Sequence, residues 1–160
     1  IEDDFIDRDL TIVDYVNEII KSFKETSKKE FIINFDQYSN SFNITKSIEI
    51  VYGLRNFIGN ANKFSKSKVF INIKSDADIT EILIEDDGEG YPNDVLRKIG
   101  EPYIKSYKSS IKSKSGLGLG IFIGKTLLEK NYASILCRNS ETRGGAEVNI
   151  KWKNKDLLNL

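Results

Sequence analysis

Two neighbouring segments of alternating polarity constrain the fold of this chain more than any other feature of its sequence. The first, KVFINIK, covers residues 68–74, and the second, ITEILIED, covers residues 79–86. Alternation with a period of two is typical of a strand that buries one face, and the short connection over residues 75–78 predicts a β-hairpin. The core of this chain is therefore expected to include an antiparallel pair of strands with one buried face.

Helical periodicity and further strand patterns flank this hairpin. Val13, Val16, Ile20 and Phe23 share one face at helical spacing and predict a first helix that begins near Thr11. The other expected helices cover about residues 45–65, 91–98 and 117–130, the short one with Pro92 at its first position. The other expected strands cover residues 31–36, 133–139 and 146–152. Three main helices and about five strands, mostly antiparallel by their connections, indicate an α+β two-layer sandwich.

The composition is that of one soluble globular domain. Of 160 residues, 39% are hydrophobic and 30% are charged, which is enough to bury a core without disulfides. The 24 basic and 24 acidic residues leave no basic surplus, which argues against nucleic acid as a partner. Because Cys137 is the lone cysteine and no apolar run approaches a membrane span, a reducing, cytoplasmic setting is expected.

The chain contains neither histidine nor methionine. Without histidine, Ser-His-Asp catalysis, Cys-His catalysis and histidine-ligated metal sites are all excluded. The start at Ile1 predicts that the chain is part of a longer protein. We expect residues 1–10 to be an acidic linker from an upstream region, residues 11–152 to form the domain, and residues 153–160 to be a C-terminal tail.

The helix expected over residues 45–65 carries a polar stripe that suits a metal-bound polyphosphate. Asn56, Asn60 and Lys63 lie roughly 130° around this helix from its apolar stripe. Asparagine is a mediocre helix former, and Gly53 and Gly59 each cost about 1 kcal/mol relative to alanine, so stability alone does not explain these residues. Asn60 offers a neutral oxygen to Mg²⁺, and Lys63 can neutralise phosphate charge. The alternative is a solvated helix face, where both residue types are common.

The second strand of the hairpin ends in a sequence that suits a purine base. Ile82, Ile84 and Asp86 point to one face of the strand, so Asp86 lies at the edge of the core if the isoleucines are buried. A carboxylate there needs a donor, which the amino group of a ligand such as adenine would supply. Gly88 and Gly90 allow the backbone to approach a flat base closely. The alternative is a strand-end turn, for which Asp-Gly is a common signal.

The glycine-rich segment over residues 116–126, GLGLGIFIGKT, matches neither of two familiar nucleotide motifs. A dinucleotide fingerprint requires G-x-G-x-x-G, but Ile121 and Ile123 occupy the third-glycine positions. A Walker A loop requires a glycine where Leu119 stands. Both motifs are therefore rejected.

Gly116, Gly118 and Gly120 nevertheless lead into a helix, and amides at a helix start can cradle phosphate with the help of the helix dipole. No acidic residue lies between Glu101 and Glu129. The same interval contains five lysines, namely Lys105, Lys108, Lys112, Lys114 and Lys125. A mobile basic loop before a glycine-rich helix start suits a lid over polyphosphate, and a flexible solvated loop is the alternative.

In order along the chain, these segments resemble the nucleotide-binding domain of sensor histidine kinases, within the Bergerat-fold ATPases. The resemblance covers roughly residues 11–152 and rests on an N box (Asn56, Asn60, Lys63), a G1 box (Asp86, Gly88, Gly90), an F box (Glu101, Pro102, Tyr103), a G2 box (Gly116, Gly118, Gly120) and a terminal glycine motif (Gly144–Gly145). Two positions depart from the family: Tyr103 replaces the usual phenylalanine, and Tyr52 stands where many relatives carry a polar or ionisable residue. The phrases GEPY, GLGLGIFIGKTLLEK and GGAEVNIKW look most like RegB/PrrB-type redox-responsive kinases.

The resemblance implies a mixed five-stranded sheet packed on three helices, with ATP and Mg²⁺ bound between the helices under a flexible lid. Asp86 would bind the adenine amino group, and Gly88 and Gly90 would shape the base pocket. Asn60 would hold Mg²⁺ and, with Lys63, is an expected catalytic residue. The other expected contacts to the phosphates or the lid are Asn56, Tyr103, Lys105, Gly116, Leu117, Gly118, Leu119 and Gly120.

The function that the resemblance implies is phosphoryl transfer from ATP to a histidine outside this chain, on an upstream dimerising hairpin, with a response regulator as the next acceptor. The chain alone is expected to be monomeric with little kinase activity. The full-length protein would be a homodimer, either cytoplasmic or the cytoplasmic part of an inner-membrane sensor. The alternatives are a non-catalytic nucleotide-sensing or interaction module, and another Bergerat-fold ATPase or serine kinase. Cys137 is expected to be a buried structural thiol rather than a redox group.

Overall fold

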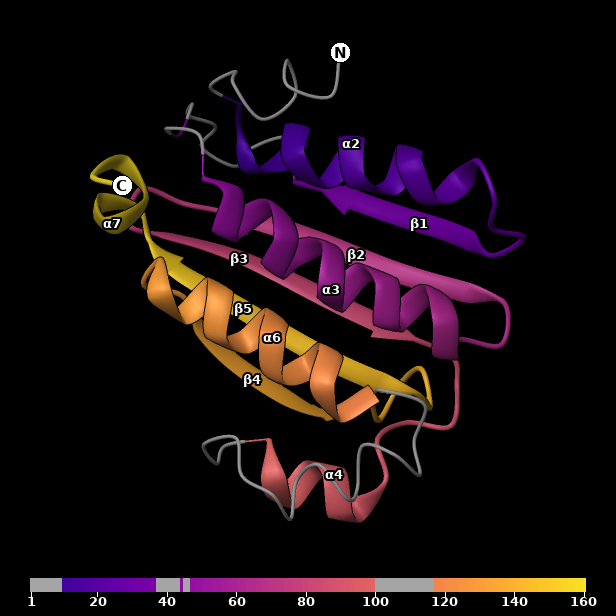
Figure 1. Ribbon diagram of the computed structural model, residues 1–160. Helices are drawn as coiled ribbons and strands as arrows, with labels where there is room; N and C mark the ends of the chain where they lie inside the picture. Colours follow the sequence, from indigo (N-terminus) through magenta and orange to yellow (C-terminus); the bar gives the residue numbers. More distant parts are fainter. Residues whose placement is uncertain (1–9, 37–43, 45–46, 100–116) are drawn as a thin grey trace.

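The architecture is a mixed five-stranded sheet with a layer of helices on one face (Figure 1). The computed structural model describes residues 10–36, 44, 47–99 and 117–160. The strand order is β1-β2-β3-β5-β4, and the bounds are Glu30–Phe35 for β1, Lys68–Ser75 for β2, Ile79–Asp86 for β3, Ser134–Asn139 for β4 and Ala146–Lys153 for β5. β1 and β2 are parallel, and the other neighbouring pairs are antiparallel. The expected α+β fold with a mixed sheet is confirmed.

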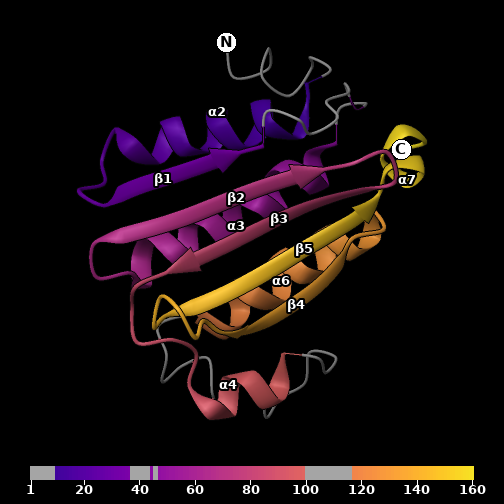
Figure 2. The ribbon, with the colours of Figure 1, turned by 180° about the vertical axis from the view of Figure 1, so that it is seen from behind.

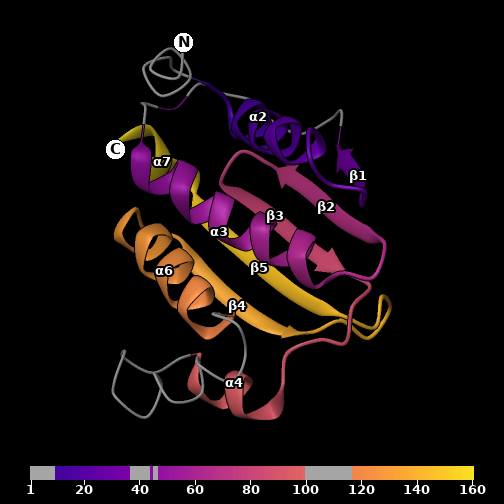
Figure 3. The same ribbon diagram turned by 45° about the vertical axis from the view of Figure 1, so that its right-hand side comes forward.

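Within the described ranges, three long helices form the second layer, namely α2 (Ile12–Lys24), α3 (Ile48–Phe64) and α6 (Leu117–Lys130). α3 lies between the other two over the sheet (Figure 3). Seen from behind, the opposite face of the sheet carries no helix from the described ranges (Figure 2). The short helices α4 (Asn93–Lys98) and α7 (Asn154–Leu158) lie at the margins. Within the part of the chain that the structure describes, no helix has both the length and the apolar character that a membrane crossing requires.

The predicted hairpin is the centre of the sheet. Its register pairs Ile71 with Ile84 and Ile73 with Ile82, and each of these side chains is at most 2% exposed. Because alternate residues of a strand face the same side, Asp86 follows Ile82 and Ile84 toward the helical layer. The carboxylate therefore ends the core-facing row of β3, as the alternation predicts.

Side chains at the helix starts fix where the helices begin. The Thr11 hydroxyl accepts the N–H of Asp14 at 3.1 Å while the Asp14 carboxylate accepts the N–H of Thr11 at 3.2 Å, which is a capping box. The Ser47 hydroxyl accepts the N–H of Ile50 at 3.2 Å, so α3 begins at Ile48, a turn later than the sequence pattern suggests. Pro92 occupies the N-cap of α4, one position before the expected one.

Two glycines let α3 and α6 approach closely. A Cβ atom at Gly53 would lie 2.6 Å from the Leu128 side chain, and one at Gly124 would lie 2.8 Å from the Phe57 ring. A glycine within a helix lowers stability, but here the two helices can approach closely only because these positions have no side chain. The same contact brings the start of α6 to Asn60 of α3, because a Cβ atom at Gly120 would lie 3.1 Å from the Asn60 amide group.

The end of the chain packs on the domain. Residues 153–160, expected as a tail, include α7, in which the Leu157 side chain is fully buried. The Asn154 side chain accepts the Thr80 hydroxyl at 2.7 Å and donates to the carbonyl of Asp76 at 2.8 Å. These contacts join α7 to the hairpin connection between β2 and β3.

Candidate functional site

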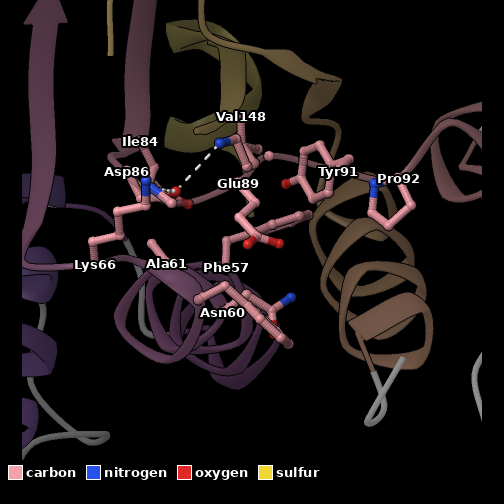
Figure 4. A pocket seen from close by; sticks show the side chains of 14 residues that line it. Phe57, Asn60, Ala61, Lys66, Ile84, Asp86, Glu89, Tyr91, Pro92 and Val148 are labelled. Carbon is pink, nitrogen blue, oxygen red and sulfur yellow. Dashed lines mark hydrogen bonds between the residues drawn. The ribbon is translucent and has the colours of Figure 1, made fainter. Parts of the chain in front are cut away.

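A cavity of about 380 Å³ lies between α3 and the ends of β3 and β5 (Figure 4). Its lining residues come from α3 and the segment after it (Phe57, Asn60, Ala61, Phe64 and Lys66), from β3 and the loop after it (Ile84, Asp86, Gly88, Glu89, Gly90, Tyr91 and Pro92), and from β5 (Ala146 and Val148). The walls are mainly apolar, and a few polar groups interrupt them. Such a site is typical of a small organic ligand with an apolar body and some polar atoms.

Asp86 is the buried charge of this cavity, and its side chain is 3% exposed. Its Oδ1 accepts the N–H of Gly88 at 2.8 Å and the N–H of Ala146 at 3.3 Å. Burial raises the pKa of Asp86 above its ordinary value, and these two N–H groups oppose that rise. No described residue donates a hydrogen bond to Oδ2, so this oxygen can accept one from a ligand.

Glycines allow the backbone to close around Asp86. A Cβ atom at Gly145 would lie 2.1 Å from Asp86 Oδ1, and one at Gly88 would lie 2.1 Å from the carbonyl oxygen of Phe64. A side chain at either position would displace the backbone or the carboxylate. Gly88 lines the cavity and also makes room for the end of α3, while Gly145 provides the close approach to Asp86. The expected role of Gly88 in shaping a base pocket stays a prediction.

Asn60 supplies a second polar group. Its Nδ2 atom is buried and has no hydrogen-bond partner among the described residues. A buried donor without a partner costs about 1–3 kcal/mol, so this amide group is suited to a polar ligand atom. The first turn of α6 lies directly against it, at Gly120.

Similarity of the sequence to known proteins identifies the family of this chain. Residues 45–156 match the family of histidine kinase-, DNA gyrase B-, and HSP90-like ATPases. The chain belongs to this ATPase family. It is 37% identical over 125 residues to the sensor histidine kinase RegB of Cereibacter sphaeroides, a match that covers 68% of this chain and 27% of RegB. A putative NtrY-like sensor histidine kinase of Rickettsia bellii is 26% identical over 146 residues, covering 89% of this chain and 23% of that protein.

This ATPase domain spans about a quarter of the length of those relatives. Solved structures share its fold at lower identity. The catalytic domain of the histidine kinase ThkA has a TM-score of 0.71 at 18% identity, covering 91% of this chain and 96% of that one. The mycobacterial sensor histidine kinase MprB has a TM-score of 0.68 at 17% identity, covering 92% and 97%. The expected resemblance to sensor histidine kinases and the expected fold are confirmed.

The N-box side chains of the domain differ in their positions. Asn60 lines the cavity, whereas Asn56 donates from Nδ2 to the carbonyl of Tyr52 at 2.7 Å within α3. Lys63 is exposed, with its ammonium group 5.2 Å from the centre of the Phe64 ring. Neither Asn56 nor Lys63 lines the cavity, and their phosphate roles stay predictions.

The glycine-rich segment lies partly outside the described residues. Leu117, Gly118, Leu119 and Gly120 form the first turn of α6, and Gly120 lies next to Asn60. The first turn of a helix presents backbone N–H groups that have no partner within the helix. The remaining predicted site residues, namely Tyr103, Lys105 and Gly116, fall outside the described ranges. The same holds for Glu101 and Pro102 of the F box and for Lys108, Lys112 and Lys114 of the expected lid.

Most of the residues that line the cavity were not predicted as site residues. Among them, Tyr91, Ala146 and Val148 form part of the apolar wall. The alternation of β5 does place Val148 on the buried face, and Tyr91 directly follows the G1 glycines. Lys66 also lines the cavity and follows α3 closely. Sequence signals for these residues existed, but they indicate burial or proximity rather than a role.

Proposed function

We propose that this chain is the ATP-binding catalytic domain of a two-component sensor histidine kinase. The observation that carries the proposal is Asp86, a buried carboxylate at an apolar cavity with one oxygen held by two backbone amides. Its second oxygen is suited to the amino group of adenine, whose flat ring fits between apolar walls. Guanine carries a carbonyl at the equivalent position, which a carboxylate repels.

The phosphates would lie toward the start of α6. Asn60 has a buried, unpartnered amide nitrogen on this side of the cavity, and the first turn of α6 adds backbone N–H groups. These groups fit a triphosphate. We further propose that Asn56 and Lys63, together with the lid residues Tyr103 and Lys105, contact the phosphates or enclose them.

A magnesium ion fits the same place. Among the described residues, no group of three or more acidic, histidine or cysteine side chains could hold a metal ion. Mg²⁺ binds nucleotide phosphates with one or two protein ligands and several waters, so a single amide oxygen from Asn60 suffices. Bound Mg²⁺ supplies charge neutralisation at the transferring phosphoryl group, and the residues of this chain orient the nucleotide.

The phosphoryl acceptor must belong to another segment or another protein. The chain contains no histidine, so it cannot carry the phosphorylated residue of a histidine kinase. We propose that the acceptor lies on a dimerising helical region of the full-length protein and that a response regulator receives the group next. The chain alone would bind ATP and transfer little phosphate.

Calorimetric titration with ADP, with and without Mg²⁺, tests the proposal. Wild type is expected to bind ADP and not GDP. Asp86→Asn replaces an acceptor oxygen with a donor and is expected to weaken ADP binding by at least about a hundredfold. Glu81→Gln is the matched control, because Glu81 lies on the same strand and bonds Asn149, a residue outside the cavity lining.

Two results would contradict the proposal. The first is that wild type binds no adenine nucleotide under any condition, which would favour a pure interaction module. The second is that Asp86→Asn binds ADP as tightly as Glu81→Gln, which would show that Asp86 does not contact the nucleotide.

A further inference from the structure

The loop between β3 and α4 forms one wall of the cavity without regular secondary structure. It contributes Gly88, Glu89, Gly90, Tyr91 and Pro92 to the lining. A wall of this kind needs partners for its main-chain polar groups, because strand and helix ladders do not supply them. These hydrogen-bond partners determine whether the loop is held in one conformation before a ligand binds.

Asn139, the last residue of β4, supplies two of these partners. Its Oδ1 accepts the N–H of Tyr91 at 2.6 Å, and its Nδ2 donates to the carbonyl oxygen of Tyr91 at 3.2 Å. The side-chain amide thus pairs with both main-chain groups of one loop residue, as a neighbouring strand would. The two residues lie 48 positions apart in the sequence.

Gly90 fits the loop to this contact. A Cβ atom at Gly90 would lie 2.6 Å from Asn139 Oδ1, and the φ angle of Gly90 is +84°. Both facts require glycine, because a side chain would collide with the amide group and would also disfavour the left-handed backbone. The G1 glycine therefore accommodates Asn139 as well as the cavity.

The Tyr91 ring has a second support on the same strand. Tyr91 is 6% exposed and lines the cavity, and its hydroxyl lies beside the thiol of Cys137. Burial raises the pKa of Cys137 to about 12, so the thiol is neutral near pH 7 and is not a nucleophile. Cys137 and Asn139 pair in register with Val148 and Ala146 of β5, which also line the cavity.

We propose that Asn139 is a positioning residue of the nucleotide site, which holds the main chain of Tyr91 and so fixes the loop wall opposite α3. The inference rests on the proposed function, because it takes the cavity to be the adenine pocket. Asn139 acts through Tyr91 and is not itself among the lining residues. A wall that is already in place spares the ordering cost that the nucleotide would otherwise have to offset.

Asn139→Ala tests the proposal in the complete chain. Asn139 is exposed at the end of an edge strand, so the variant is expected to fold with a melting temperature close to that of wild type. The dissociation constant for ADP, measured by calorimetry, is expected to rise about tenfold. Asn149→Ala is the matched control, because it removes a side-chain hydrogen bond to Glu81 from β5 without touching the loop. It is expected to leave ADP binding unchanged.

Asn139→Asp separates positioning from general damage. It keeps the acceptor for the Tyr91 N–H and replaces the donor to the Tyr91 carbonyl by a second oxygen. Because this oxygen repels the Tyr91 carbonyl oxygen, an ADP affinity below that of wild type is the expected result. Asn139→Asp binding ADP as tightly as wild type would count against a role for the contact with the Tyr91 carbonyl.

Hydrogen exchange without nucleotide provides a second, independent measurement of how firmly the loop is held. In Asn139→Ala, amide protection is expected to fall in a peptide covering residues 88–91 and to stay unchanged in β3 and β5. If wild type binds no nucleotide, the proposed function fails, and exchange still reports whether Asn139 holds the loop. If wild type binds ADP and Asn139→Ala binds it equally well, the positioning role is overturned while the proposed function stands.

Discussion

Asp86 and Asp87 are adjacent, yet the fold gives their carboxyl groups opposite electrostatic environments. Burial dominates at Asp86 and raises its pKa. At Asp87 burial acts in the same direction but is outweighed by four hydrogen bonds, so its pKa lies well below the ordinary value of 3.8. The donors are the N–H groups of Lys66, Ser67 and Lys68 and the Ser67 hydroxyl, at 2.8–3.2 Å. Asp87 thereby ties the loop after β3 to the segment between α3 and β2.

Asp87→Ala is expected to lower the free energy of unfolding at pH 7, because it removes these hydrogen bonds. The loss is expected to be only about 1 kcal/mol, because solvent screens the interactions of a partly exposed carboxylate. The folded-state pKa of Asp87 lies below 3.8, so its stabilisation is present above that pH and is lost as the pH falls through the folded-state pKa. Urea unfolding at several pH values should therefore show that the difference in the free energy of unfolding between wild type and Asp87→Ala becomes smaller below pH 3.8. Asp78→Ala is the control. A difference between wild type and Asp87→Ala that does not change with pH would contradict a stabilising role of the ionised Asp87 carboxylate.

At the same scale, sequence patterns identify residues that lie in periodic elements and miss those that act through long-range contacts. Asp86 follows from the alternation of β3, and the structure places it in the cavity. Asn139 contacts a loop residue 48 positions away, and no periodic signal marks such a pair. Gly145 was visible as part of a glycine pair, but its packing against Asp86 depends on how β5 approaches β3.

Among the elements, β3 and α6 have the bounds that the sequence predicts, residues 79–86 and 117–130. Both follow from strong patterns, a clean alternation in one and an apolar segment after glycines in the other. α7 was not predicted, because five residues are too few to show a helical period. Its place depends on the tertiary contacts of Leu157 and Asn154.

The contact between α3 and α6 yields a prediction of its own. Gly53→Ala and Gly124→Ala are each expected to lower the free energy of unfolding by about 1–3 kcal/mol through overpacking. This loss opposes the gain of about 1 kcal/mol in helix propensity. The clashes would be with the side chains of Leu128 and Phe57, which are buried and cannot move freely. Urea unfolding followed by circular dichroism measures the change.

Gly59→Ala in the same helix is the matched control. Its Cβ atom would meet only the ring of Phe23, at 3.2 Å, and this ring is partly exposed and can shift. The variant is expected to be the most stable of the three. Equal stability changes for all three would show that propensity rather than close packing governs α3.

At the scale of the whole molecule, the cavity lies between the two layers, so a ligand there contacts both. α3 provides one wall, and β3, β5 and the loop after β3 provide the others. These walls come from segments far apart in the sequence, and they exist only when the domain is folded. A ligand of this cavity therefore binds the folded state alone and must stabilise it.

ADP at about a hundred times its dissociation constant is expected to add about 2.7 kcal/mol to the free energy of unfolding. For a domain of this size that amounts to a rise of about 5–10 °C in melting temperature, measurable by differential scanning fluorimetry. The rise should disappear in Asp86→Asn and persist in Glu81→Gln, because only the first substitution changes the cavity. An equal rise in both variants would mean that ADP binds elsewhere on the domain. If ADP does not raise the melting temperature of wild type, that result by itself would contradict binding between the layers.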